Sequence, residues 1–479
     1  MTLDTPVTTI EVRNPRTGVA DYSFVPTTPS ELQDIARAAR AAQVDWQALG
    51  LEARIAILTH WVEKVDAAAP EIVAAVTADT GRHAESLREI GNIGKWVDRW
   101  SAVARKALTL EPTPTANPDI HSFADYSPYP VLGVISPWNF PLSLSLMDAI
   151  PALLAGCAVI IKPSEVTPRF VEPLVASIAE VPELAEVLHY VCGAGALGAA
   201  LVDEADMICF TGSTATGRKV ASQAAARFIP CFTELGGKDP AIVLEGADLD
   251  RATSAILTGA TLATGQQCYS IERIYVHRSL HDAFVAQLAE KARAVKLALP
   301  EPDDGRIGPL TFAPQAEIIA AHLADARAKG AEVHSGGEIE THGGGLWCAP
   351  TVLSNVDHDM AVMTEESFGP LMPVMAFDTV DEAVRLANDS PYGLSGAVFG
   401  LEDDALAVAR RLDLGGISIN DAGLAPFFIG DATVAEKTAF KSSGLGGSRL
   451  GPDSIKRFLR RKALLVNRST RKSPWWFDA

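Results

Sequence analysis

The chain has no cysteine pair of the C-x-x-C type, no apolar run of membrane-spanning length and no excess of positive charge. Its six cysteines are widely scattered, a pattern typical of a reducing compartment and not of a disulfide scaffold or zinc site. The formal net charge of −18 argues against a nucleic-acid or anionic-membrane partner, because either would need a basic face. The N-terminal residues show no basic segment followed by an apolar one, as a secretory signal would. We therefore expect a cytoplasmic protein that binds no nucleic acid, no membrane and no metal.

Length and composition indicate a globular protein with more than one domain. The chain has 479 residues, which is too long for one ordinary core, so two or three domains are expected. Residues 29–108 are Ala-rich and helical in pattern, with breaks expected near Gly50, Pro70 and Gly81. After residue 130 the pattern changes to short apolar runs that alternate with helical segments.

This alternation predicts an α/β fold with a parallel, doubly wound sheet. In the first region the expected strands are 131–136, 158–161, 189–192, 206–210 and 229–234, and the expected helices are 142–156, 166–179 and 217–226. In a second region, from 240 to 420, the clearest strands are 241–244, 271–276, 372–377 and 416–420, and the clearest helices are 378–388 and 403–412. Because dinucleotides bind such sheets at the carboxyl ends of the strands, residues that follow each strand are candidates for cofactor contacts.

One cysteine lies in a turn between two regular elements. Residues 263–270 (Ala-Thr-Gly-Gln-Gln-Cys-Tyr-Ser) follow a helix-compatible run and precede a strand-like run over 271–277. Gly265 allows close backbone approach or a positive φ, and the N–H beside Cys268 could donate to an oxyanion. A free cysteine is more often a small buried hydrophobe. Considered alone, the turn favours that structural interpretation over a nucleophile.

Polar residues follow three of the expected strands in the first region. Residues 137–141 (Pro-Trp-Asn-Phe-Pro) hold the amide of Asn139 on a rigid turn. A lysine and a carboxylate in 162–165 could bind ribose hydroxyls or form an ordinary surface pair. Residues 210–217 form a Gly/Ser/Thr turn before a helix and suit a phosphate, although the G-x-G-x-x-G fingerprint is absent.

Three further segments carry acids or glycine turns. Glu234 precedes a Gly-Gly turn in residues 234–238, residues 365–370 place acids and an aromatic before a tight turn, and residues 441–446 form a late Gly loop. Each of these segments alone is compatible with a purely structural role.

Together, in this order and at these distances, the segments resemble the NAD(P)-dependent aldehyde dehydrogenase superfamily from about residue 10 to about 467. The resemblance implies an aldehyde dehydrogenase-like α/β fold with three parts. A Rossmann-type cofactor domain would comprise 1–118 and 132–236, and an α/β catalytic domain 237–442. A small oligomerisation arm with the C-terminal tail would comprise 119–131 and 443–479. Members of the superfamily are usually homodimers or homotetramers.

The resemblance also implies a role for each matching residue. Cys268 would be the nucleophile, Glu234 the general base and Asn139 the oxyanion-hole amide. The implied contacts to NAD, with NADP as the alternative, are Lys162 and Glu165 at the adenosine ribose, Gly212, Ser213 and Gly217 at the pyrophosphate, and Glu366, Phe368 and Trp138 towards the nicotinamide. A thiol suits this chemistry because hydride leaves only after a nucleophile adds to the aldehyde, and because the thioester product can be hydrolysed.

The sequence departs from the superfamily pattern around the expected aldehyde pocket. Tyr269 and Ser270 follow the nucleophile where small residues are usual. Residues 426–430 and an unfamiliar segment through Phe440 replace the usual Pro-Phe-Gly-Gly approach to the late Gly loop. Leu144, Met147 and Tyr269 are expected to line the pocket, which would favour an aliphatic or aromatic aldehyde. No basic residue in these segments is an obvious partner for a substrate carboxylate. Residues 474–477 (Pro-Trp-Trp-Phe) are expected to form a subunit contact or to pack on their own subunit.

Two other functions compete with hydrolytic aldehyde oxidation. A CoA-acylating relative would resolve the thioester with CoA, but such relatives generally lack a carboxylate at the position of Glu234. A cofactor-binding scaffold protein could keep the fold and lose catalysis, but the presence of Cys268, Glu234 and Asn139 gives that interpretation no support.

Overall fold

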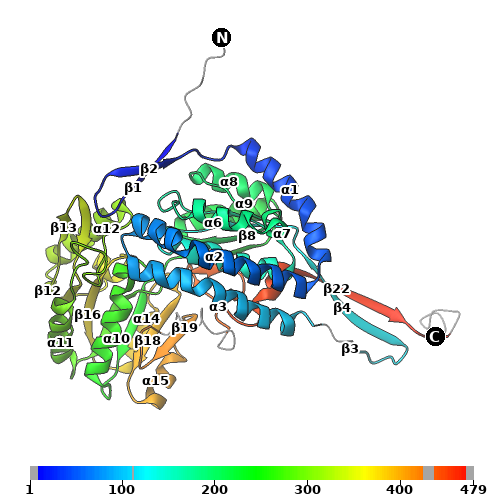
Figure 1. Cartoon of the computed structure of the whole chain (residues 1–479). Helices are drawn as coiled ribbons and strands as arrows, with labels where there is room; N and C mark the ends of the chain where they lie inside the picture. The colour runs from blue at the N-terminus through cyan, green and yellow to red at the C-terminus, as the bar shows by residue number, and fades with distance from the viewer. Residues whose placement is uncertain (1–8, 110–112, 424–435, 471–479) are drawn as a thin grey trace, which may run out of the picture.

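The computed structural model describes residues 9–109, 113–423 and 436–470. Two sheets flanked by helices form the body of the protein, and a narrow three-stranded arm projects from it (Figure 1). The segment 426–430 and the aromatic tail 474–477 lie outside the described residues, so the expectations for them stay untested.

The chain begins with a two-stranded hairpin, β1 (Ile10–Arg13) and β2 (Ala20–Phe24), and then forms three long helices, α1 (Pro29–Ala48), α2 (Leu51–Thr80) and α3 (His83–Ala107). Breaks occur at Gly50 and Gly81, as expected, and both glycines have positive φ. The break predicted at Pro70 is wrong, because α2 continues through it. Contacts of α2 with α3 and α6 hold the helix along its length and outweigh the hydrogen bond that the proline removes.

The first sheet has the strand order β21-β9-β8-β5-β6-β7, and its strands β5 to β9 are parallel. Its strands are β5 (Val131–Ile135), β6 (Ala158–Lys162), β7 (Leu188–Tyr190), β8 (Met207–Thr211), β9 (Cys231–Glu234) and β21 (Gly444–Leu445). Its helices are α4 (Pro141–Leu146), α5 (Ala149–Ala155), α6 (Val171–Ala179), α7 (Pro182–Ala185), α8 (Gly195–Glu204) and α9 (Thr214–Ala226). The predicted parallel, doubly wound sheet is therefore confirmed. The short antiparallel β21 brings residues 444–445, which we had grouped with the arm, onto the edge of this sheet.

The second sheet has the order β12-β15-β16-β11-β10-β18-β19 and is parallel except at β12. Its strands are β10 (Asp239–Val243), β11 (Ile271–His277), β12 (Glu332–Ser335), β15 (Thr351–Ser354), β16 (Leu371–Phe377), β18 (Ser395–Phe399) and β19 (Gly416–Ile419). Its helices are α10 (Leu249–Thr261), α11 (His281–Ala294), α12 (Ala313–Ala328), α13 (Ala361–Thr364), α14 (Val380–Asn388) and α15 (Glu402–Ala409). The β13 (Ile339–His342) and β14 (Gly345–Cys348) hairpin and the β17 (Tyr392–Gly393) and β20 (Phe440–Lys441) pair lie outside it.

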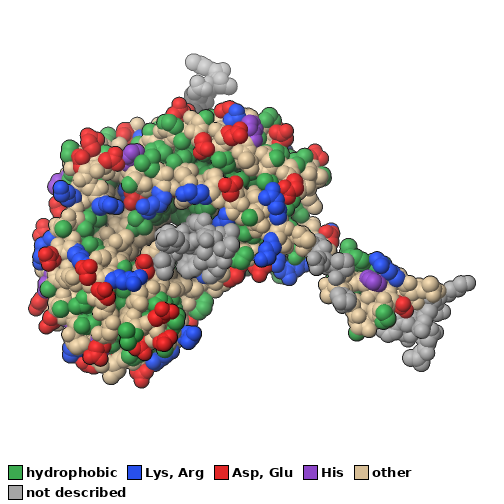
Figure 2. Space-filling view, turned by 60° about the horizontal axis from the view of Figure 1, so that its bottom comes forward, with side chains coloured by type: hydrophobic (Ala, Val, Ile, Leu, Met, Phe, Trp, Pro, Cys, Tyr) green, Lys and Arg blue, Asp and Glu red, His purple; other side chains and the backbone are tan. Residues whose placement is uncertain are grey.

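The arm consists of β22 (Leu459–Asn467), β4 (Ile120–Pro128) and β3 (Thr113–Pro114), paired antiparallel. It stands clear of the body in Figure 2. Leu464, Leu465 and Val466 on β22 are exposed, and Leu465 keeps 69% of its surface in contact with solvent. A strand with an open edge and exposed aliphatic side chains is an incomplete surface by itself.

Candidate active site

Four turns that follow parallel strands meet along one edge of the first sheet. Strand β5 leads into 136–141, β6 into 162–165, β8 into 212–213, and β9 ends at Glu234. The strand order reverses between β5 and β8, and the crevice at such a switch point is where dinucleotides bind in sheets of this kind. The topology therefore brings the predicted cofactor residues of this sheet to one place.

The contacts at this edge are specific. Lys162 Nζ donates to Glu165 Oε2 at 2.9 Å, and Ser213 caps α9 by accepting from the Thr216 N–H at 3.4 Å. At Gly217 a Cβ atom would lie 2.4 Å from Leu235 Cδ2, so the absence of a side chain lets α9 lie close to Leu235 in its present position. The N-terminus of α9 thus lies at the crevice, where the N–H groups of Thr214 and Ala215 are free of intrahelical partners and could bind an anion.

The turn before Cys268 has an unusual backbone. Ala263, Thr264 and Gly265 have φ values of 53°, 63° and 71°, in the left-handed region that non-glycine residues seldom adopt. The side chain of Gln266 holds this turn through hydrogen bonds to three backbone groups, among them the Ala263 carbonyl at 3.2 Å. A Cβ on Gly265 would lie 2.4 Å from the carbonyl carbon of Gly369. The close approach expected at Gly265 is confirmed, and so is its positive φ.

The turn after Glu234 packs directly on the turn of Cys268. A Cβ on Gly237 would lie 2.8 Å from the Cys268 carbonyl oxygen. Glu234 is only 7% exposed, and its Oε2 has no hydrogen-bond partner among the described residues. Burial raises the pKa of the Cys268 thiol to about 12, the negative charge of Glu234 raises it as well, and the Lys437 ammonium lowers it. The resting thiol is therefore protonated at neutral pH, and an unpaired carboxylate oxygen lies close enough to affect it.

Asn139 is held against the same turn. Its side-chain Nδ2 donates to the Gln266 backbone carbonyl at 3.0 Å, and its backbone carbonyl accepts from the guanidinium of Arg82. Arg82 also donates to the Ala263 carbonyl at 3.2 Å and is buried. Arg82 joins the Asn139 turn to the Cys268 turn, a role that our sequence analysis missed. The only signal for it was a basic residue directly after the helix break at Gly81.

Glu366 and Phe368 lie on a loop that reaches the Gly-Gly turn. Glu366 Oε1 accepts from the Gly237 N–H at 2.9 Å, and burial, followed by the charge of Glu272, raises the pKa of Glu366 to about 8. The Phe368 ring meets the Trp138 ring edge-on at 5.4 Å between centroids. These contacts bring together the residues predicted to lie around the nicotinamide end of the cofactor.

A buried ion pair anchors that loop. Lys238 Nζ lies 2.8 Å from Glu272 Oε2, and Glu272 accepts from the backbone N–H groups of Ser367 and Phe368 at 2.7 and 2.8 Å. Sequence analysis did not identify this pair, because the two residues are 34 positions apart, Lys238 directly before β10 and Glu272 on β11.

The predicted pocket residues have different environments. Met147 is buried and Leu144 is half-buried, both in the core of the first sheet. The Tyr269 ring lies under Lys437, whose Nζ is 4.9 Å from the ring centroid. Lys437 belongs to the segment in which the sequence showed no obvious basic partner for a substrate carboxylate. It is 5% exposed, and its Nζ has no hydrogen-bond partner among the described residues.

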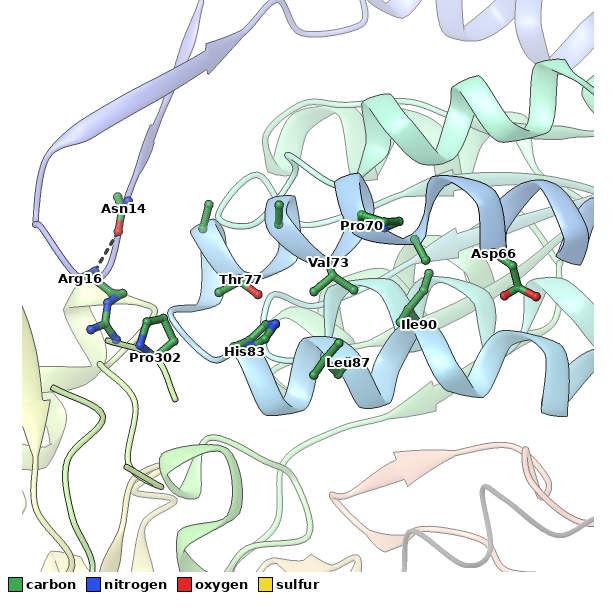
Figure 3. Close-up of a pocket in the computed structure, with 13 residues that line it drawn as sticks. Asn14, Arg16, Asp66, Pro70, Val73, Thr77, His83, Leu87, Ile90 and Pro302 are labelled. Atoms are coloured by element: carbon green, nitrogen blue, oxygen red, sulfur yellow. Dashed lines mark hydrogen bonds between the residues drawn. The ribbon is translucent and has the colours of Figure 1, made fainter. Parts of the chain in front are cut away.

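A surface groove lies elsewhere. A groove of about 810 Å³ runs across α2 and α3, lined by Val73 and Thr77 of α2 and by Leu87 and Ile90 of α3 (Figure 3). It contains none of the predicted site residues. In the described part of the chain, no group of His, Cys, Asp or Glu side chains could hold a metal ion, and no helix is long and apolar enough to cross a bilayer.

Comparison with known proteins agrees with this geometry. A sequence model of the aldehyde dehydrogenase family matches residues 3–464. A putative NADP-dependent succinate-semialdehyde dehydrogenase of Mycolicibacterium smegmatis is 35% identical, covering 92% of this chain and 86% of that protein. The 3,6-anhydro-alpha-L-galactose dehydrogenase of Streptomyces coelicolor is also 35% identical, covering 97% and 94%.

Solved structures match over nearly the whole chain. A putative aldehyde dehydrogenase from Anabaena variabilis superposes with a TM-score of 0.96 at 53% identity, covering 98% of this chain and 100% of that one. A betaine aldehyde dehydrogenase from Staphylococcus aureus in complex with NAD+ gives a TM-score of 0.89 at 30% identity, covering 98% and 93%. The expected aldehyde dehydrogenase-like α/β fold is confirmed. The chain therefore belongs to the aldehyde dehydrogenase family, whose members are oxidoreductases that oxidise aldehydes.

Proposed function

We propose that this chain oxidises an aldehyde to the carboxylic acid with NAD as hydride acceptor, through an acyl intermediate on Cys268 that water hydrolyses. One observation carries the proposal. The turn of Glu234 packs on the carbonyl of Cys268, and Glu234 keeps a buried carboxylate oxygen without a partner among the described residues. A buried unpaired acceptor is costly, so it favours a proton-transfer role beside the thiol.

In the first half-reaction Glu234 accepts the thiol proton and the Cys268 sulfur bonds to the aldehyde carbon. Proton acceptance is needed because the pKa of the thiol is raised to about 12. The carbonyl oxygen becomes an oxyanion, which the second N–H of the Asn139 amide and the Cys268 backbone N–H would stabilise by roughly 3 kcal/mol per donor. The oxyanion then re-forms the carbonyl and a thioester remains on Cys268. NAD, when bound, supplies the acceptor for the departing hydride.

The residues at the sheet edge fit this cofactor. The α9 N-terminus suits a pyrophosphate, and the Lys162–Glu165 pair suits ribose hydroxyls. Glu366 has one oxygen bound to Gly237 N–H, which leaves the other available to a second ribose. Glu165 favours NAD over NADP, because its carboxylate would oppose a 2′-phosphate. The S. aureus relative was solved in complex with NAD+, which supports NAD as the cofactor. The M. smegmatis relative is named as NADP-dependent, so NADP is the alternative cofactor.

In the second half-reaction Glu234, after releasing its first proton, takes a proton from a water that attacks the thioester carbon. The carbon–sulfur bond breaks, the acid leaves and Cys268 is restored. Glu234→Gln keeps the size of the side chain but removes its basicity. At alkaline pH, where the thiol ionises without help, the variant should release one burst of NADH equal to its sites and then turn over very slowly. Mass spectrometry should find the acyl group on Cys268.

Two results would contradict this mechanism. Steady turnover of Glu234→Gln without an adduct would show that Glu234 is not the general base for thioester hydrolysis. If the wild-type protein requires CoA for turnover, the CoA-acylating alternative is favoured. Cys268→Ala is the matched control, since it should give neither burst nor adduct while it still binds NAD. Full activity in that control would remove the nucleophile assignment.

The architecture also supports a proposal for the domain division and the assembly. We assign 1–118 and 132–236 to the cofactor domain and 237–442 to the catalytic domain, because each region contributes most of one sheet. We assign 119–131 and 443–479 to the arm and tail, with residues 444–445 extending the cofactor sheet. The exposed aliphatic residues of β22 favour a homodimer or homotetramer. All six cysteines are unpaired, which favours a cytoplasmic location.

A further inference from the structure

Lys437 is a buried cation that forms no ion pair with any described residue. Other buried cations of the described chain have acceptors: Lys238 pairs with Glu272, Arg449 with Asp148, and Arg273 donates to backbone carbonyls. Lys437 is 5% exposed, and its Nζ makes no hydrogen bond with any described residue. Because burying an ammonium without an acceptor is expensive, such a group is retained where an anion binds.

The surroundings of Lys437 leave its charge available. Its closest described contact is the face of the Tyr269 ring, and a cation–π contact compensates only part of the lost hydration. Asp239 is near enough to feel the charge, but it is not within ion-pair distance of Lys437 and is bound to Ser395. The other titratable groups of this region are Cys268, Glu234 and Glu366, and Glu366 is bound to the Gly237 N–H.

Lys437 and Tyr269 border a small cavity. Its other lining residues include Ser395 and Ser418, which contribute hydroxyl groups, and it has room for about one water molecule. Tyr269 is the next residue after Cys268, and the Lys437 ammonium lowers the pKa of the Cys268 thiol. The unpaired cation therefore lies on the nucleophile's side of the second sheet.

We propose that Lys437 determines substrate specificity by binding a carboxylate at the far end of the aldehyde, so that the preferred substrates are ω-oxo carboxylates. The inference rests on the function proposed above. One carboxylate oxygen would take the place of the single water that the cavity can hold, whereas a phosphate or sulfonate is bulkier and not planar. An ammonium donates a charge-assisted hydrogen bond to it, and the Tyr269 ring fixes the position of the ammonium.

The test compares ω-oxo carboxylates with n-alkanals of equal chain length. For the wild-type protein, kcat/KM should be higher for the oxo acid by on the order of 10- to 100-fold at the best length. In Lys437→Met this ratio should fall to about 1, and in Lys437→Arg it should be largely kept. Lys456→Met, which removes a surface lysine paired with Asp453, is the control and should keep the wild-type ratio. A wild-type ratio near 1, or an unchanged ratio in Lys437→Met, would overturn the inference.

A second measurement needs no turnover. Succinate should protect Cys268 of the wild-type protein from alkylation by iodoacetamide at a concentration at least tenfold lower than butyrate does, and Lys437→Met should lose this difference. Equal protection by the two acids would overturn the inference. If neither aldehyde class is oxidised, the proposed function fails, and the protection experiment still decides whether Lys437 binds a carboxylate. A thermal unfolding scan of each variant separates loss of recognition from loss of the fold.

Discussion

Adding one methyl group at Gly237 tests whether the Glu234 and Cys268 turns depend on their close contact. In Gly237→Ala the new Cβ would lie 2.7 Å from Asp239 Oδ1 and 2.8 Å from the Cys268 carbonyl oxygen, both closer than carbon and oxygen atoms approach without bonding. Neither neighbour can yield easily, since Asp239 is bound to Ser395 and the other atom belongs to the backbone. The turn that carries Glu234 must therefore move by several tenths of an ångström.

We expect two separable effects of this substitution. Overpacking should lower the free energy of unfolding by about 1–3 kcal/mol. Displacement of Glu234 and loss of the Gly237 N–H bond to Glu366 should lower kcat by roughly 10-fold, because a misplacement of about 1 Å can cost roughly 100-fold and the expected shift is smaller. Urea unfolding measures the first effect, and pre-steady-state NADH formation with an aldehyde measures the second.

The control is Gly91→Ala on the exposed side of α3, where a Cβ would meet no atom within 4 Å. It should leave kcat unchanged and raise the free energy of unfolding by about 0.5–1 kcal/mol, because alanine favours a helix interior. If Gly237→Ala turns over like the wild-type protein, the two turns do not depend on the contact that we describe.

Three further outcomes are expected. With the pKa of the Cys268 thiol raised to about 12, its alkylation by iodoacetamide should accelerate about tenfold per pH unit from pH 7 to 10, and a plateau near pH 8 would contradict this. The kcat/KM for NAD should exceed that for NADP, and Glu165→Gln should narrow the difference; a wild-type preference for NADP would show that Glu165 does not oppose the 2′-phosphate. Leu465→Asp should lower the mass of the assembly in sedimentation analysis, because a charge would replace an exposed aliphatic side chain on the arm; an unchanged mass would remove β22 from the interface.

Local patterns predicted most of the architecture. Buried apolar runs located β5, β6 and β8 to within a residue or two, because each strand is covered on both faces and must be continuously apolar. The glycine turns could also be predicted from the sequence. At Gly265, for example, any side chain would clash with the backbone of Gly369. The predicted helix break at Pro70 was wrong because the local sequence did not decide the structure there. Its local tendency to break the helix was overridden by packing against α3 and α6, which the sequence does not show.

The electrostatic partners in the site were not predictable from sequence. Lys437 lies about 170 residues from Tyr269, and nothing near it in the chain indicates that its amine is buried. The same holds for Lys238 and Glu272, which become a pair only when β10 and β11 lie next to each other. Sequence patterns of period two or 3.6 report which face of an element is buried. They do not report which charged residue of another element faces it.

Arg82 offers the sharpest test of how the site is held together. Its guanidinium donates to the backbone carbonyls of Asn139 and Ala263, and its Cζ atom lies 5.3 Å from the Phe140 ring centroid. In Arg82→Met both carbonyls lose a charged donor, so the free energy of unfolding should fall by about 3 kcal/mol or more. The Asn139 amide would also no longer be held in position beside the turn of Cys268. We therefore expect kcat/KM for an aldehyde to fall at least tenfold, while the Kd for NAD changes little.

Arg82→Lys separates the structural effect from the catalytic one. Lysine keeps the charge but can donate to only one of the two carbonyls in good geometry, because it lacks the planar fork of arginine. We expect this variant to recover most of the stability and only part of the activity, so that stability and kcat/KM change by different proportions in the two variants. If activity instead follows stability proportionally, Arg82 only supports the fold. If Arg82→Met keeps full activity, the oxyanion-hole amide does not need the bridge between the two turns.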